Sequence, residues 1–260
     1  MTKILAVTNQ KGGVGKTTTS INLAASLAVM NQRVLLIDLD PQANATMGSG
    51  IDKRGLTATV YQVLLGNMTL AQARIRSEKG KYDVLPASRD LAGAEIELVE
   101  LDGRETRLKD ALQTVINDYD YVLIDCPPAL NLLTLNGLCA AQTVMIPMQC
   151  EYYALEGLSD LVNTIRKVRA HLNPILEIEG LLRTMFDPRN TLAQQVSDQL
   201  QQHFGDKVYR TIIPRNVRIA EAPSYGVPVF YHDRLSKGTQ AYLALAGEML
   251  KIPEAVAEPQ

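Results

Sequence analysis

Short, continuous apolar runs alternate along this chain with longer segments of helical periodicity. The runs are rich in Val, Ile and Leu and predict strands at Ile4–Thr8, Val34–Asp38, Tyr82–Pro86, Tyr121–Asp125, Thr143–Pro147, Gly180–Met185 and Val208–Ile213. The segments between them place apolar residues three or four positions apart, as helices do, for example at Thr17–Met30, Arg107–Asn117, Leu155–His171 and Leu192–Phe204. Strands that are apolar throughout are typical of sheets covered by helices on both faces. We therefore predict a single-domain α/β protein with a mostly parallel, twisted sheet flanked by helices.

No linker rich in Gly, Ser or Pro divides the 260 residues. We expect one domain over residues 1–252 and a short mobile tail over residues 253–260. The chain has 26 Lys and Arg against 28 Asp and Glu, a net charge of −2, and 46% hydrophobic residues. This balance excludes a strongly basic nucleic-acid-coating protein and an acidic disordered chain, but it does not exclude a local basic patch.

The sequence predicts a reduced, cytoplasmic protein. Its three cysteines, Cys126, Cys139 and Cys150, are odd in number and lack the spacing of a paired disulfide framework or a CxxC metal site. The start, MTKILAVTNQ, lacks the features of a signal peptide. Uninterrupted apolar stretches stay well below the roughly 20 residues that a membrane helix needs, so we expect no membrane partner.

A phosphate-binding loop is the strongest motif. The first predicted strand leads into Lys11-Gly12-Gly13-Val14-Gly15-Lys16-Thr17-Thr18, and a helix follows. Strand, glycine-rich turn and helix are the context of a P-loop, whose backbone N–H groups surround phosphate oxygens. Lys16 would neutralise the β- and γ-phosphates, and the Thr17 hydroxyl would bind Mg²⁺.

This loop departs from the usual GxxxxGK[ST] pattern. Gln10 stands where the first glycine is expected, and Lys11 adds a second lysine inside the loop. One loop surrounds one triphosphate, so a second lysine that points away from it would most naturally reach a nucleotide on another subunit. A solvated surface lysine is the simpler alternative.

Acidic residues end two of the predicted strands. Asp38 and Asp40 share one side of the chain after Val34–Ile37, and Asp125 follows Tyr121–Ile124. Acids at these strand ends, beside a P-loop, are placed to hold Mg²⁺ or to orient the attacking water. We predict Asp40 and Asp125 for these tasks, with loops after each as nucleotide-sensing switches, while helix capping or turn formation is the alternative for Asp38.

These segments, with DLDPQANAT, DCPP and IIPRNVRIAEAPSYGVPV, resemble the ParA/Soj-type chromosome-partitioning ATPases over nearly the whole chain. The resemblance implies a deviant Walker A loop, weak ATP hydrolysis with Mg²⁺, and an ATP-sandwich homodimer in which Lys11 crosses the interface and Gly12 lies in it. It implies that Lys11, Lys16 and Asp40 are catalytic, that Asp40 activates water, and that Thr17, Asp40 and Asp125 serve the metal. Pro214 and Asn216 would lie against the adenine, with Thr184 and Met185 bordering the same base.

The same resemblance implies nonspecific binding of double-stranded DNA by the ATP dimer and stimulation by a ParB-type centromere-binding protein. Residues 163–218 hold nine cations and five acids, a local charge of +4 in a chain of −2. Arg189 and Arg218 match positions of DNA-contacting arginines in relatives, and Arg215 and Lys237 are secondary candidates. A solvated basic face is the alternative. The expected place of action is the cytoplasm, in association with the nucleoid.

Three other functions compete with this hypothesis. A MinD-like membrane-cycling ATPase would need a terminal amphipathic helix, and the sequence from Leu250 onward carries prolines and acids instead. An iron–sulfur relative would need a convincing cysteine arrangement. A metabolic ligase would need a second-substrate pocket, for which the sequence offers no recognisable motif.

Overall fold

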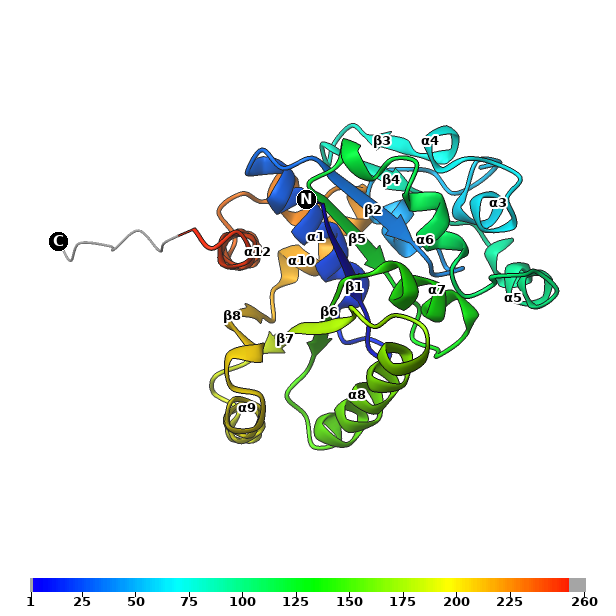
Figure 1. Ribbon diagram of the computed structural model, residues 1–260. Coiled ribbons are helices and arrows are strands. Elements are labelled where there is room, and N and C mark those ends of the chain that lie inside the picture. The colour runs from blue at the N-terminus through cyan, green and yellow to red at the C-terminus, as the bar shows by residue number, and fades with distance from the viewer. Residues whose placement is uncertain (1, 253–260) are drawn as a thin grey trace.

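The computed structural model describes residues 2–252, and the predicted tail at 253–260 lies outside these described residues. Within them, eight strands form one sheet in the order β3-β4-β2-β5-β1-β6-β7-β8 (Figure 1). Neighbouring strands are parallel except β3 and β4, which are antiparallel. The predicted fold, a mostly parallel α/β sheet, is confirmed. The strands are β1 Lys3–Val7, β2 Val34–Asp38, β3 Ile75–Ser77, β4 Tyr82–Leu85, β5 Tyr121–Asp125, β6 Thr143–Met148, β7 Glu177–Phe186 and β8 Val208–Pro214.

Helices cover both faces of the sheet because side chains alternate along each strand. Leu35 and Ile37 of β2 point into one apolar core, whereas Val34 and Leu36 point into the other. The first core is covered by α3 Val60–Leu65, α4 Leu70–Ala73, α5 Leu91–Val99, α6 Arg107–Leu112, α7 Leu132–Ala140, α8 Ala154–His171 and α9 Thr191–Phe204. The second is covered by α1 Lys16–Val29, α2 Asn44–Gly48, α10 Val217–Glu221, α11 Val229–His232 and α12 Lys237–Met249, with the 3₁₀ turn η3 Ala222–Tyr225.

One predicted helix is shorter than expected. The pattern predicted a helix over Arg107–Asn117, but α6 ends at Leu112 and a 3₁₀ turn, η1 Ile116–Asp118, follows. The Thr114 hydroxyl donates to the carbonyl of Ala111 (2.8 Å). Three β-branched residues in a row, from Thr114 to Ile116, also disfavour continued helix.

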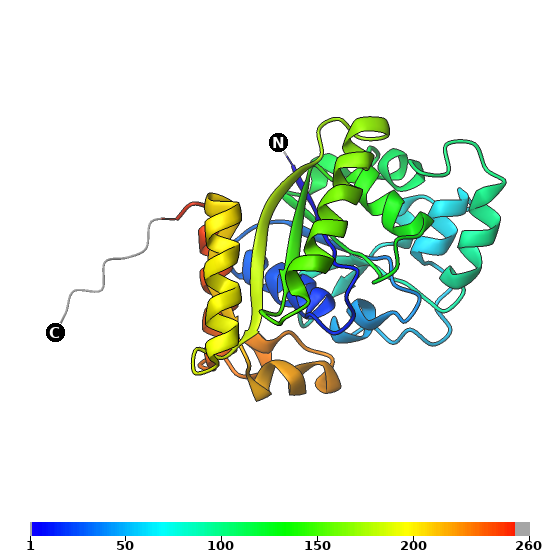
Figure 2. The ribbon, with the colours of Figure 1, turned by 90° about the horizontal axis from the view of Figure 1, so that it is seen from below.

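The central strands β2, β5 and β1 end at the same edge of the sheet. Their register pairs Asp38 with Asp125 and Val7 with Asp125. Figure 2 shows the segment from α10 to α11, in orange, at the end of the sheet opposite the N-terminus. Ligand sites in open parallel sheets lie at these carboxyl ends. No helix within residues 2–252 has the length and apolar character needed to cross a membrane.

Candidate functional site

The glycine-rich loop between β1 and α1 is held open by its own backbone and by neighbouring strands. Gly13 and Gly15 have φ angles of +73° and +88°, which side chains rarely allow. The buried Thr184 hydroxyl, on β7, donates to the carbonyl of Val14 (2.8 Å), and the Gln149 amide donates to the carbonyl of Gly13 (3.2 Å). The loop is therefore a fixed cradle whose shape depends on strands from the other half of the sheet.

Lys16 begins α1 and closes this loop from inside. Its side chain is buried, and its ammonium donates to the carbonyl of Lys11 (3.0 Å). Burial lowers the pKa of Lys16, and the nearby carboxylates of Asp125 and Asp40 oppose that shift. A lysine held at the centre of a curled loop is the group that a phosphate would meet.

Asp125 at the end of β5 is fully buried and bonded to the first turns of α1. The Thr17 hydroxyl donates to one carboxylate oxygen (2.7 Å) and the Ser20 hydroxyl to the other (2.9 Å). The sequence analysis did not single out Ser20, although its position three residues after Thr17 places both on one side of the helix. Burial, and then the negative charge of Asp38, raise the pKa of Asp125.

Asp38 anchors the loop that carries Asp40. Its carboxylate accepts from the backbone N–H and the hydroxyl of Thr46 (both 2.8 Å) and from the N–H of Asp40 (3.1 Å). Thr46 also accepts from the N–H of Ala87 (3.0 Å). The half-buried Asp40 accepts from the N–H of Gln42 (2.9 Å). Asp38 thus has the turn-forming contacts that were the alternative for it, whereas Asp40 lies at the start of the loop, beside the P-loop.

The donor set at these strand ends fits a divalent cation. Burial raises the pKa of Asp38 as well as that of Asp125, and Asp38, Asp40 and Asp125 repel one another. Hard oxygen donors gathered with excess negative charge favour Mg²⁺ over a site without metal. Thr17 and Asp125 are the residues that would hold it, directly or through water, with Asp40 beside them.

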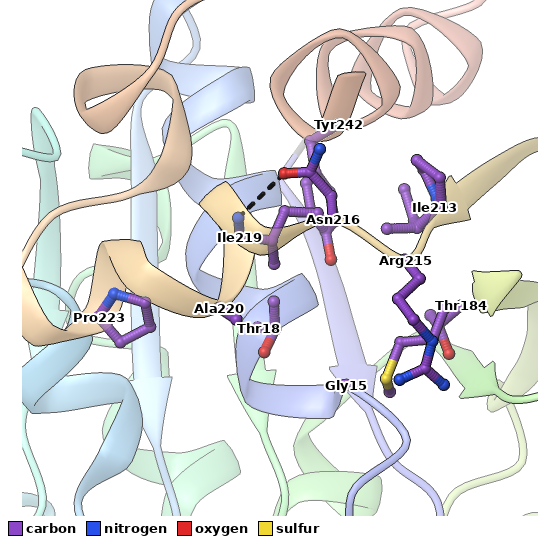
Figure 3. Close-up of a pocket in the computed structure, with 12 residues that line it drawn as sticks. Gly15, Thr18, Thr184, Ile213, Arg215, Asn216, Ile219, Ala220, Pro223 and Tyr242 are labelled. Carbon is purple, nitrogen blue, oxygen red and sulfur yellow. Dashed lines mark hydrogen bonds between the residues drawn. The ribbon is translucent and has the colours of Figure 1, made fainter. Parts of the chain in front are cut away.

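A cavity of about 260 Å³ opens beside the P-loop, between α1, β7, β8 and α10 (Figure 3). It contains every residue that the sequence analysis placed near a base. Figure 3 shows Arg215 along one side of this cavity, beside Thr184, rather than turned away from it. The lining residues are Gly15, Thr18, Thr184, Met185, Ile213, Pro214, Arg215, Asn216, Ile219, Ala220, Pro223 and Tyr242.

Lys11 lies on the outside of the loop. Its side chain is half exposed, and its ammonium pairs with the carboxylate of Glu151, just after β6. A Cβ added at Gly12 would meet no atom within 4 Å. Within one chain, therefore, Gly12 has no steric reason to be glycine, and Lys11 has no contact with its own phosphate cradle apart from its backbone.

The four predicted DNA-contacting cations lie at the carboxyl end of the sheet. Arg189 follows β7 and pairs with Asp187, and Arg218 on α10 pairs with Glu221 and Asp233. Arg215 follows β8, and Lys237 begins α12 and is exposed. These acids reduce the local positive charge below what the sequence count indicates.

One cation of the basic segment is not a surface charge at all. Arg183 on β7 is 9% exposed and donates to the Ser197 hydroxyl (2.9 Å) and the Tyr209 carbonyl (2.7 Å). Its burial lowers its pKa. Counting Arg183 toward a basic surface was therefore wrong, because the alternation of β7 directs it inward.

The three cysteines are buried and far apart in the fold. Cys126 follows β5, Cys139 lies in α7 and Cys150 follows β6. Burial raises the pKa of all three thiols, to about 11 for Cys139 and Cys150. Within residues 2–252, groups of three or more His, Cys, Asp or Glu side chains placed to hold a metal ion do not occur.

Comparison with known proteins places this architecture. Residues 2–178 match the family described as AAA domain. The sporulation initiation inhibitor protein Soj of Bacillus subtilis is 55% identical, over 96% of this chain and 98% of that protein. The chromosome partitioning protein ParA of Myxococcus xanthus is 52% identical, over 96% and 88%.

A solved structure of similar fold carries a different kind of name. A cobyrinic acid a,c-diamide synthase from Mycobacterium smegmatis, with bound ADP and magnesium, has a TM-score of 0.86 and 41% identity, over 96% of this chain and 95% of that one. All three likenesses span nearly the whole chain, from the P-loop through the segment after β8. The chain belongs to the ParA/Soj family of P-loop ATPases.

Proposed function

We propose that this chain is a DNA-partitioning ATPase whose ATP- and Mg²⁺-bound homodimer binds double-stranded DNA without sequence preference and releases it after hydrolysis. The observation that carries the proposal is the position of the segment from Pro214 to Pro223. On its inner side Pro214, Asn216 and Ile219 line the cavity beside the P-loop, and the same segment carries Arg215 and Arg218. A nucleotide in the cavity would therefore fix the backbone that presents these arginines.

The nucleotide chemistry follows from the fixed groups of the site. The backbone of Gly12 to Gly15, with the N–H groups of Lys16, Thr17 and Thr18 at the start of α1, would bind the phosphates. The Lys16 ammonium would neutralise the charge that develops during transfer of the terminal phosphoryl group. Mg²⁺, when bound, supplies electrostatic stabilisation of the phosphates. Asp40 would position the attacking water.

Dimerisation would explain two residues that have no role within one chain. Lys11 would leave Glu151 and contact the nucleotide of the other subunit. Gly12 would allow the two loops to pack closely, since its free space within one chain is open to a second copy. Each active site would then be incomplete without its partner.

DNA binding and its release follow from the dimer. Two copies of the surface that carries Arg189, Arg215, Arg218 and Lys237 would together attract the phosphate backbone, although one chain carries a net charge of −2. The names of the relatives favour a chromosome or a plasmid as cargo. By the same likeness, a ParB-type partner would stimulate hydrolysis, and the complex would act at the nucleoid in the cytoplasm.

A ligase function is the second candidate, because the solved relative from Mycobacterium smegmatis is named as a diamide synthase. It would require a second substrate near the terminal phosphate and would not require ATP-dependent DNA binding. A MinD-like protein would instead bind anionic membranes when loaded with ATP. Both alternatives thus differ from the partition function in the molecule that is bound.

The decisive experiment is a titration of a fluorescent duplex with the protein and ATP, ADP or a non-hydrolysable ATP analogue, at two salt concentrations. We expect tight, sequence-independent binding with ATP and the analogue, weak binding with ADP, and affinity that falls as salt rises. Equal binding with ATP and ADP, or none at either salt concentration, would contradict the proposal.

A further inference from the structure

Two short segments with the same design lie side by side at the carboxyl end of the sheet. Each consists of a cation, an apolar residue and a second cation just where a helix begins. The first is Arg215 to Arg218 at the start of α10, and the second is Arg234 to Lys237 at the start of α12. We call these two segments the paired turns. Their apolar members are Val217 and Leu235.

The paired turns are packed against each other. A Cβ added at Gly238, in the first turn of α12, would lie 2.5 Å from the side chain of Ile219 and 3.1 Å from the side-chain oxygen of Asn216. The Arg218 guanidinium also pairs with Asp233 (3.3 Å). The two helix starts therefore form one continuous surface.

Both turns are rigid. The Asn216 side chain accepts from the N–H of Ile219, and the Ser236 hydroxyl accepts from the N–H of Thr239, so each turn is fixed by a helix cap (both 3.2 Å). Asp233 accepts from the N–H of Leu235 (3.1 Å). The conformations that expose the apolar side chains are thus built into the fold.

The apolar residues of the paired turns face solvent instead of the core. Leu235 is 87% exposed and Val217 is 68% exposed, although each is flanked by cations. Arg234 is held over the ring of Phe230, 5.2 Å from its centroid, and so is aligned beside Leu235. Exposed aliphatic side chains on rigid turns between positive charges suit a polyanion that also offers an apolar surface.

We propose that Val217 and Leu235 form an apolar wedge that enters the minor groove of duplex DNA while the flanking cations contact phosphates. This inference rests on the proposed function and specifies how that DNA is held. Duplex DNA fits both properties, because its backbone is anionic and its stacked bases are apolar. Aliphatic side chains inserted from the minor groove separate base steps and bend the duplex. The fixed position of the turns means that the cost of ordering the wedge is met on folding rather than on binding.

The test compares the double variant Val217→Ala/Leu235→Ala with the wild-type chain and with Ile96→Ala. Ile96 is a matched control because it is an apolar residue 78% exposed on α5, at the far side of the molecule from α12 (Figure 1). Far-UV circular dichroism and the thermal midpoint establish that each protein is folded. With ATP and a duplex of about 25 base pairs, we expect the double variant to bind about tenfold more weakly than wild type, and Ile96→Ala to bind like wild type.

Salt dependence separates the wedge from the phosphate contacts. Loss of an apolar contact releases no fewer counterions, so the double variant should keep the wild-type slope of log affinity against log salt. Loss of one phosphate contact, as in Lys237→Ala, should reduce that slope by about 0.9. Energy transfer between dyes at the two ends of the duplex should show bending by the wild type and less bending by the double variant.

Three results would overturn the inference. The wedge is absent if the wild type binds DNA with ATP and the double variant binds and bends it equally well. It is also absent if the double variant loses binding only to vesicles of phosphatidylglycerol, which would make this surface a membrane contact. If the wild type itself shows no ATP-dependent binding to DNA, the proposed function fails as well, and that outcome is distinguishable from the first.

Discussion

The hydroxyl of Thr17 donates a hydrogen bond of 2.7 Å to a carboxylate oxygen of Asp125, which joins the first turn of α1 to the end of β5. The bond links the phosphate cradle to the buried acid at the neighbouring strand end. Because Ser20 holds the other oxygen of Asp125, the carboxylate is fixed in orientation by one helix. The two residues that would serve the metal are therefore positioned together before nucleotide binds.

Replacing Thr17 should show whether its hydroxyl serves the metal. Thr17→Ala removes both the bond to Asp125 and the oxygen ligand, so we expect ATP hydrolysis to fall by about tenfold or more and the Mg²⁺ concentration for half-maximal activity to rise. Thr17→Ser keeps the oxygen and should stay close to wild type. A phosphate-release assay across a Mg²⁺ titration measures both quantities. Full activity of Thr17→Ala would exclude the residue as a ligand.

Lys11 and Glu151 can be separated by a pair of variants. Lys11→Ala and Glu151→Gln both break the ion pair between them, which is half exposed and contributes at most about 1 kcal/mol to stability. If Lys11 bridges to a second nucleotide, Lys11→Ala should abolish ATP-dependent dimerisation in light scattering, whereas Glu151→Gln should dimerise. Loss of dimerisation in both variants to the same extent would instead assign the effect to the ion pair.

Asp40→Ala should lose turnover but keep ATP-dependent DNA binding. The loop that carries Asp40 is held by the bonds from Thr46 to Asp38, which the substitution leaves in place. ATP would then remain intact and the dimer would persist, so DNA should dissociate more slowly than from wild type in the presence of ATP. Stopped-flow dissociation from a labelled duplex measures this. A variant that hydrolyses ATP at the wild-type rate would exclude Asp40 as the residue that positions water.

The fold and the elements of the nucleotide site could be predicted because their signals are local. An apolar run fixes a buried strand, and the residue after it must lie at the sheet edge, which is how Asp38, Asp125 and the P-loop come together. The bond between Asp38 and Thr46 joins residues eight positions apart through a loop, so its path had to be seen. β3 escaped prediction because its sequence, Ile-Arg-Ser, is too short and polar to form a recognisable run.

Surface charge was harder to predict than the nucleotide site. Arg183 and Arg189 are six residues apart, yet one is bonded inside the sheet and the other extends into solvent from a loop. Their difference depends on which way β7 alternates and on which side chains of α9 approach it. The residue type alone carries neither piece of information.

This contrast gives a final prediction. Arg183→Met removes buried, charge-assisted hydrogen bonds to Ser197 and Tyr209, so the free energy of unfolding should fall by about 2–3 kcal/mol in urea denaturation. Its DNA affinity per folded molecule should not change. Arg218→Glu should do the reverse: its ion pairs are at the surface and stabilise little, but DNA binding with ATP should weaken and the salt dependence should become shallower. If Arg218→Glu leaves DNA affinity and its salt dependence unchanged, DNA binds elsewhere, because a phosphate contact cannot be replaced by a negative charge without either effect.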